Sequence, residues 1–162
     1  MPTSSVIEIR VANEADAPAI AACLAAAFEG FRSQYTDAAY ADTVADEPAV
    51  RARLTHMAIF VAVAADGAVV GTLAASATGN AGHLRGLAVH EAWQGSSVAK
   101  DLLNAVEHWL ITAGCTEVTL HVTAVLHRAM RFYEKNGFSR TGRTEDFFGM
   151  PLAEFSKPLS VR

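Results

Sequence analysis

The stretch from Leu87 to Leu103 constrains the fold more than any other part of the sequence. It begins with an apolar run typical of a buried strand, passes through a polar turn that contains Gly95, and ends in a segment whose leucines recur at helical spacing. A strand that leads directly into a helix gathers the unpaired first N–H groups of the helix around the turn. Because these amides carry the positive end of the helix dipole, the stretch predicts a cradle for a phosphate or diphosphate.

The remaining sequence predicts strands and helices in alternation. Apolar residues at every second position indicate strands, and apolar residues three and four apart indicate helices. Asp66 and Gly67 separate two strand-like runs, as in a tight hairpin. We expect strands over residues 6–11, 59–65, 68–75, 83–89, 117–122, 138–143 and 155–159. We expect helices over residues 16–28, 97–113 and 126–135, one helix or a pair of short helices within 30–57, and a loose segment over 78–82.

Length and composition limit the classes of protein to consider. The chain has 162 residues, 51% of them hydrophobic, which is enough for one well-filled core and short for two. We therefore expect a single domain over residues 1–162. The net charge of −4 argues against a nucleic-acid partner and mildly favours cationic substrates. No long apolar run and no basic segment leading into one is present, so we expect no membrane insertion, no export and a cytoplasmic location.

Two ordered motifs resemble those of the GNAT acetyltransferases. Residues Gln94 to Ala99 stand where that superfamily has Q/R-x-x-G-x-G/A, and Phe132, Tyr133, Gly137 and Phe138 resemble its FYxxxGF signature. The resemblance implies a GNAT-like α/β (α+β) fold with a central mixed, mostly antiparallel sheet of six to seven strands flanked by about four helices. It also implies that acetyl-CoA is the co-substrate.

The resemblance assigns the cofactor site to the turn and the strand before it. The turn is expected to bind the pyrophosphate of acetyl-CoA, while the strand lies along the pantetheine arm. The cofactor-binding residues implied in this way are Leu87, Ala88, Val89, Gln94, Gly95, Ser96, Ser97, Val98, Ala99 and Tyr133. Ser97 departs from the family, which usually has glycine there so that the backbone can approach the phosphates. Leu126 also departs, because the family often has an asparagine there that hydrogen-bonds the cofactor arm.

An amine must lose a proton before it can attack a thioester. With a pKa near 10.4, roughly one alkylamine in two thousand is neutral at pH 7, so deprotonation costs about 4 to 5 kcal/mol. The resemblance implies that Tyr133 is the general acid that protonates the departing thiolate. His83 is the candidate general base, since the run HLRGLAVH is similar to a base-bearing strand of some family members. An exposed histidine at a strand end is the alternative reading of His83.

Other polar residues near these motifs are weaker candidates. Arg85 stands where the similar strand has a second histidine, which argues against a two-histidine relay and makes Arg85 a candidate contact for an anionic group of the substrate. Glu29, Asp37 and Glu91 are alternative bases, although each is more typical of a surface carboxylate.

No motif indicates a metal site or a disulfide. The other histidines have no HxH or HExxH spacing, so we predict no metal. Cys23 and Cys115 lie far apart and form no CxxC pair, which favours reduced, packed thiols.

Together these features predict an N-acetyltransferase that moves an acetyl group from acetyl-CoA directly to a primary amine of a small molecule. A peptide or protein N-acetyltransferase is one alternative, and the shape of residues 30–57 and 143–154 would decide between the two acceptors. A non-catalytic acyl-CoA-binding sensory module is the other, suggested by Ser97 and Leu126 but not by Tyr133. Many relatives pair through sheet edges or helices, so a homodimer is a further expectation.

Overall fold

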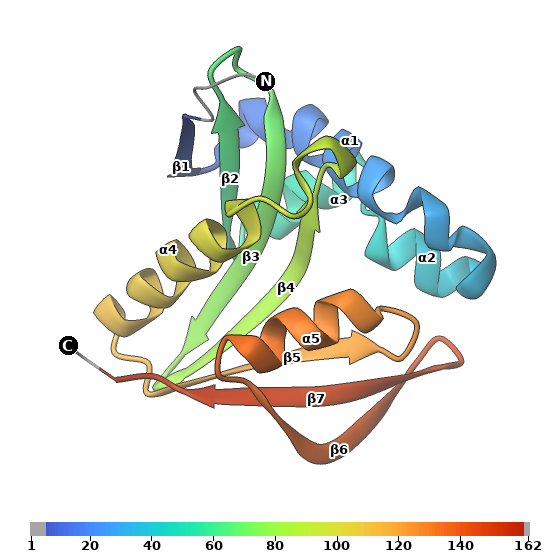
Figure 1. Cartoon of the computed structure of the whole chain (residues 1–162), viewed down its shortest axis with the longest axis vertical. Coiled ribbons are helices and arrows are strands. Elements are labelled where there is room, and N and C mark those ends of the chain that lie inside the picture. Colours follow the sequence, from blue (N-terminus) through green and yellow to red (C-terminus); the bar gives the residue numbers. More distant parts are fainter. Residues whose placement is uncertain (1–5, 161–162) are drawn as a thin grey trace.

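The computed structural model describes residues 6–160. Seven strands form one sheet in the order β1-β2-β3-β4-β5-β7-β6 (Figure 1). Only β4 and β5 pair in parallel; the other neighbours pair antiparallel. The mixed, mostly antiparallel α/β sheet predicted from the sequence is therefore confirmed. The strands are β1 (Ile7–Val11), β2 (Ala58–Ala64), β3 (Val69–Thr78), β4 (Ala81–Val89), β5 (Glu117–Thr123), β6 (Ser139–Phe147) and β7 (Met150–Pro158).

Five α-helices accompany the sheet within the described residues, one more than the approximate expectation. The difference lies in residues 30–57, which form a pair of short helices after a 3-10 segment (Glu29–Gln34). Each short helix begins at its own capping side chain: Thr36 accepts from the Ala39 amide, and Asp46 accepts from the Ala49 amide. The helices are α1 (Ala17–Phe28), α2 (Asp37–Thr43), α3 (Glu47–Leu54), α4 (Val98–Thr112) and α5 (His127–Lys135).

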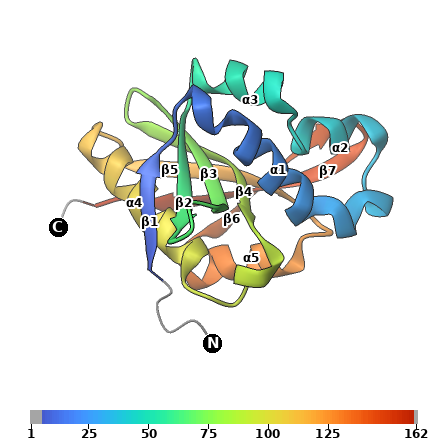
Figure 2. The ribbon, with the colours of Figure 1, turned by 90° about the horizontal axis from the view of Figure 1, so that it is seen from above.

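The helices cover the two faces of the sheet in separate layers. Helices α1 and α3 lie on one face, and α4 and α5 on the other (Figure 2). Helix α4 turns Val98, Leu102, Val106 and Leu110 into the core, each at most 1% exposed. Their spacing of four residues places them on one stripe of the helix, in keeping with the helical spacing of leucines in the sequence. None of the described helices is long and apolar enough to cross a membrane.

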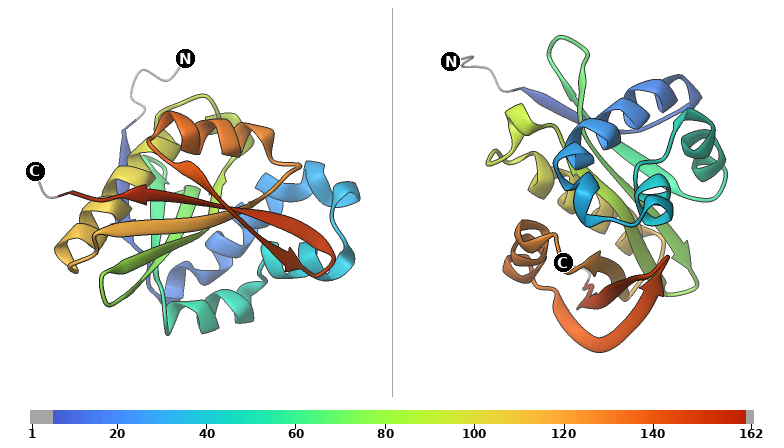
Figure 3. Two further views of the ribbon diagram at one scale, coloured as in Figure 1. Left: turned by 90° about the horizontal axis from the view of Figure 1, so that it is seen from below. Right: turned by 90° about the vertical axis from the view of Figure 1, so that its right-hand side faces the viewer.

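Two segments differ from the sequence prediction. The segment 78–82 is not loose, because β3 continues to Thr78 and β4 begins at Ala81, which leaves a two-residue connection. In the C-terminal hairpin, β6 continues to Phe147 rather than ending near Arg143, and β7 begins at Met150 rather than near Phe155 and pairs with both β5 and β6. The tip of the β6–β7 hairpin reaches α2 (Figure 3), where the Thr36 hydroxyl donates a hydrogen bond of 2.8 Å to the Phe148 carbonyl. These strands are longer than their apolar runs because backbone pairing, rather than side-chain burial, sets their ends.

Strands β4 and β5 begin side by side and then diverge (Figure 1). Their pairing runs only from Ala81 opposite Glu117 to His83 opposite Thr119. Beyond that point β4 contains a bulge: Arg85 pairs with Ala74 and Ala88 with Thr72, so β4 has one extra residue. Gly86, inside the bulge, has a φ of 72°, a conformation that L side chains rarely adopt. The bulge bends β4 away from β5 and leaves its later backbone groups on that side without a strand partner among the described residues.

Gly71 lets α4 approach the sheet closely. An added Cβ at Gly71 would lie 2.8 Å from Val98 Cγ1, whereas one at Gly30 would meet nothing within 4 Å. Gly71→Ala should therefore lower the free energy of unfolding by about 1 to 3 kcal/mol, the usual cost of overpacking. Gly30→Ala is the matched control and should change it little. Urea denaturation measures both, and equal stability of the two variants would contradict the close packing of α4.

Candidate active site

Two adjoining cavities open where β4 and β5 diverge. The larger has a volume of about 700 Å³ and the smaller about 280 Å³. Phe28, Leu87, Leu126 and Ala129 line both, so the cavities share an apolar wall made by α1, β4 and the start of α5. A ligand in one cavity can therefore lie against a ligand in the other.

The larger cavity collects most of the residues that the sequence assigned to cofactor binding. Its lining includes Leu87, Ala88, Val89, Gln94, Gly95, Ser96 and Ala99. Three expected residues do not line it. Val98 is 1% exposed and faces the core under α4, the Ser97 hydroxyl donates to Asp101 instead, and Tyr133 lines the smaller cavity.

The backbone of the turn has the form of an anion cradle. Gly95 has a φ of 82°, which glycine adopts without strain, whereas Ser97 has an ordinary φ of −83°. Of these two residues, only the glycine needs a positive φ. The serine at position 97 therefore introduces no backbone strain. Among the described residues, no backbone carbonyl accepts from the amides of Ala99 and Lys100 at the start of α4. These amides remain available to an anionic ligand.

Basic side chains add positive charge to the larger cavity. Gln94 links its two sides, because its amide nitrogen donates to the Val89 carbonyl and its oxygen accepts from Arg128 at 3.1 Å. The cationic residues that line the cavity are Lys100, Arg128, Arg131 and Lys135. This concentration of charge on a protein of net charge −4 suits a polyanionic ligand such as a nucleotide with several phosphates.

Leu126, the second departure from the family pattern, lies in an apolar part of the site. The side chain belongs to the wall shared by both cavities and packs against both main hydrophobic clusters. It gives that wall apolar contact where the family often has an amide. His127, next to Leu126 in the sequence, is exposed and lines the larger cavity.

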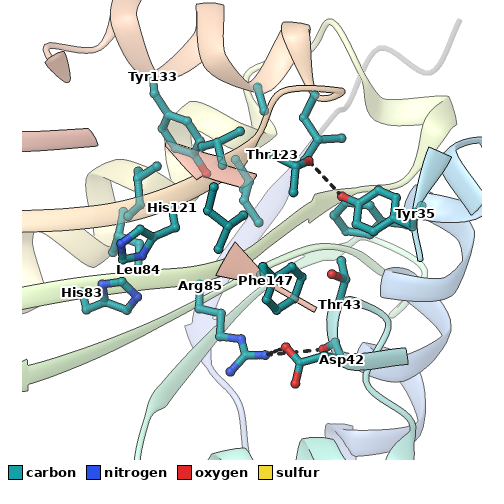
Figure 4. A pocket seen from close by; sticks show the side chains of 18 residues that line it. Tyr35, Asp42, Thr43, His83, Leu84, Arg85, His121, Thr123, Tyr133 and Phe147 are labelled. Atoms are coloured by element: carbon teal, nitrogen blue, oxygen red, sulfur yellow. Dashed lines mark hydrogen bonds and ion pairs between the residues drawn. The ribbon is translucent and has the colours of Figure 1, made fainter. Parts of the chain in front are cut away.

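Tyr133 projects from α5 toward the smaller cavity (Figure 4). Its ring packs edge-on between Phe132 and Phe138, at centroid distances of 5.5 Å and 5.4 Å. The residue is 6% exposed, and burial raises the pKa of its hydroxyl well above the ordinary value. The hydroxyl is therefore protonated at neutral pH and can act as a proton donor.

His83 lies on another wall of the same cavity (Figure 4). Its Nδ1 lies 3.1 Å from the Thr119 hydroxyl of β5, within hydrogen-bond distance. When Nδ1 donates this bond, Nε2 carries the free lone pair. Burial lowers the pKa of His83 below 6.5, and the nearby His121 and Arg85 lower it further. The imidazole is therefore neutral at pH 7 and can accept a proton.

The structure adds His121, which sequence reasoning set aside. Its ring centroid lies 5.4 Å from that of His83, and its Nε2 lies 3.5 Å from a Glu154 carboxylate oxygen. That nitrogen is buried and has no hydrogen-bond partner among residues 6–160. The sequence argued against a histidine pair because position 85 of the same strand is arginine; the second histidine comes instead from β5. The alternation of apolar residues along β5 indicated that His121 points away from the apolar face of the strand. It did not indicate that His121 would lie beside His83 of β4.

The alternative bases do not belong to the site. Glu29, Asp37 and Glu91 are exposed and line neither cavity. Among the described residues, no group of three or more histidine, cysteine or carboxylate side chains is arranged to hold a metal ion.

Comparison with known proteins identifies the family. The model of the acetyltransferase (GNAT) family matches residues 20–138. The chain belongs to the GNAT family. Members of this family use acetyl-CoA, and the phosphate cradle, the basic lining and the size of the larger cavity fit that molecule.

Two curated relatives and one solved structure illustrate the range of this family. N-acetylaspartate synthetase of Danio rerio is 35% identical over 115 residues, which are 70% of this chain and 40% of that protein. Aminoglycoside N(6')-acetyltransferase type 1 of Stenotrophomonas maltophilia is 35% identical over 104 residues, 59% of this chain and 67% of that protein. The PaiA N-acetyltransferase of Thermoplasma acidophilum, solved with coenzyme A, has a TM-score of 0.78 at 19% identity, over 94% of this chain and 99% of that one. The chain thus spans less than half of the Danio rerio protein, and the structural likeness concerns the fold.

The turn at Gly95 provides a test of the larger cavity. Gly95→Val should weaken acetyl-CoA binding, because a β-branched residue resists the φ of 82° and the cradle must change shape. Gly95→Asn is the matched control, since asparagine tolerates this conformation better, and it should retain more of the affinity. Calorimetric titration measures both, and wild-type affinity in the valine variant would place the ligand elsewhere.

Proposed function

We propose that this protein is an acetyl-CoA-dependent N-acetyltransferase that acts on a primary amine of a small molecule, with His83 as general base and Tyr133 as general acid. The observation that carries the proposal is their convergence. A neutral imidazole and a protonated phenol line one cavity of about 280 Å³, which shares a wall with the cavity suited to acetyl-CoA. Bound acetyl-CoA would supply the acetyl thioester.

The two side chains account for the protons of the reaction. Nε2 of His83 takes a proton from the ammonium group, at the cost of about 4 to 5 kcal/mol that neutral pH imposes on an alkylamine. The amine nitrogen then forms a bond to the acetyl carbon while the carbon–sulfur bond breaks. The Tyr133 hydroxyl donates its proton to the departing sulfur, and the second proton that the nitrogen loses as the amide forms returns to the Tyr133 oxygen. His83 then releases its proton to solvent. The products are an amide and the free thiol of CoA.

The walls of the smaller cavity favour a small acceptor over a peptide. Tyr35 and Thr43, on the helical side, and Phe147, at the hairpin end, line this cavity. The Thr36–Phe148 hydrogen bond joins these two elements, and the cavity volume of about 280 Å³ lies slightly below the usual range for ligand sites. The sensory-module alternative is disfavoured because it gives no role to a buried phenol and an imidazole that face one cavity.

Thiol release tests this function. The protein is incubated with acetyl-CoA and a panel of primary amines and short peptides, and the free thiol of CoA is measured. Release that depends on a small amine supports the proposal, and release with peptides only favours the peptide alternative. Acetyl-CoA binding without release on any acceptor would establish the sensory module instead.

Tyr133→Phe removes the proposed acid and keeps the packed ring. We expect kcat to fall by about 10²-fold or more, while acetyl-CoA affinity changes little, because the hydroxyl acts on the departing sulfur. Phe132→Leu is a control for the disturbance of the ring cluster. An unchanged kcat in the Tyr133→Phe variant would remove Tyr133 from the mechanism.

The pH dependence of kcat/KM tests His83. Because burial favours the neutral imidazole, its pKa lies below 6.5, and the base becomes protonated only as the pH falls below that value. We expect kcat/KM to fall on the acid side with a midpoint below pH 6.5. His83→Gln should lower kcat/KM by about 10²-fold and abolish this acid limb.

His108→Gln is the control for the pH profile, since His108 is exposed on α4 and lines neither cavity. It should keep the wild-type profile. An acid limb that survives in the His83→Gln variant would assign the titration to another group.

A further inference from the structure

One wall of the smaller cavity carries an ion pair between β4 and α2. Arg85 of β4 pairs with Asp42 of α2 (Figure 4), and both residues line the cavity. Their side chains are 40% and 37% exposed. The Arg85 guanidinium uses Nη2 for this pair, so a planar fork of further N–H donors remains for a second acceptor.

A second guanidinium lies behind this wall. Arg53 of α3 is 8% exposed, and its Nη1 lies 3.2 Å from the position that a Cβ on Gly86 would occupy. Among residues 6–160, no carboxylate forms an ion pair with Arg53 and no acceptor forms a hydrogen bond with its guanidinium. Burial, and after it the charge of Arg85, lowers the pKa of Arg53 to about 10 against the opposing effect of Asp42. Two positive charges therefore share one carboxylate here.

The opposite end of the cavity carries no lysine or arginine side chain among the described residues. His83 and His121 lie there. The carboxylates of Glu145 and Glu154, which do not line the cavity, lie 3.7 Å and 3.5 Å from Nε2 of His121. His83 and Arg85 are two residues apart on one strand, so their side chains share a face and start about 6.6 Å apart. One end of the cavity thus has a neutral imidazole that can take a proton from an ammonium group, and the other end, within the length of a small molecule, has the positive charge of Arg85.

We propose, on the basis of the N-acetyltransferase function above, that the acceptor is an amine that also carries a carboxylate, such as an amino acid. Arg85 binds this carboxylate, Arg53 contributes the second positive charge from behind, and Asp42 holds Arg85 in position. The ammonium group then lies toward His83, where it loses its proton. A polycationic acceptor would place positive charge against both arginines and is disfavoured.

A comparison of amino acids with their carboxamides tests this inference on the wild-type protein. Each amino acid of a panel is paired with the amide of the same side chain, an aminoglycoside is included, and kcat/KM is measured by thiol release. We expect each acid to exceed its amide by about tenfold or more, the usual worth of a charge-assisted contact. Loss of the carboxylate lowers the pKa of the amine, which by itself would favour the amide, so the expected preference cannot come from amine basicity.

Arg85→Gln assigns the preference to a residue. The ratio of kcat/KM between acid and amide should fall toward one, mainly through a higher KM for the acid. Arg51→Gln is the matched control, because Arg51 is also an arginine of similar exposure in an ion pair, with Glu47, but lines neither cavity. It should keep the wild-type ratio. Acetyl-CoA binding and the thermal midpoint confirm that each variant is folded.

The outcomes separate the two proposals. Release with amides or the aminoglycoside equal to or above release with acids would overturn the carboxylate site and leave the acetyltransferase function standing. A preference for acids that survives in Arg85→Gln would overturn the assignment to Arg85. Its ion pair with Asp42 would then only connect β4 with α2. Absence of release with every amine would overturn the acetyltransferase function and this inference with it.

Discussion

The divergence of β4 from β5 is the constraint on which the candidate site depends. Parallel pairing holds the two strands together only as far as His83 and Thr119, and the bulge at Gly86 then bends β4 away. A buried strand with unpaired backbone groups is costly unless something else satisfies them. An extended ligand with amide groups can pair with such a strand edge. The same divergence opens both cavities, so the sheet defect that creates the cofactor site also places it against the proposed acceptor site.

Charge distinguishes the two cavities. The larger is lined by four lysine and arginine side chains and by free helix amides, which suits a polyanion. The smaller combines an imidazole and a phenol whose pKa values burial moves in opposite directions, the base downward and the acid upward. Each group is thereby kept at neutral pH in the protonation state that its proposed role needs. Environment rather than residue type thus assigns the two roles.

The sequence predicted the parts of the fold that depend on local patterning. The helix expected over residues 97–113 and the turn at Gly95 are properties of one segment, and both are found as expected. Contacts across the sheet could not be predicted in the same way. His121 meets His83 only because β5 pairs with β4 in one particular register, and Asp42 reaches Arg85 only because α2 is a separate helix. Neither relation leaves a periodic signal in the sequence, so the histidine pair and the ion-paired wall are seen only in the structure.

Hydrogen–deuterium exchange with and without saturating acetyl-CoA tests the role of the divergence most directly. If the ligand occupies the space between the two strands, exchange should slow in residues 84–89 of β4 and in residues 95–100 of the turn and α4. Residues of the edge strands β1 and β6 should exchange at unchanged rates and serve as the internal control. Protection confined to other segments, or none in these two under saturating ligand, would contradict the account.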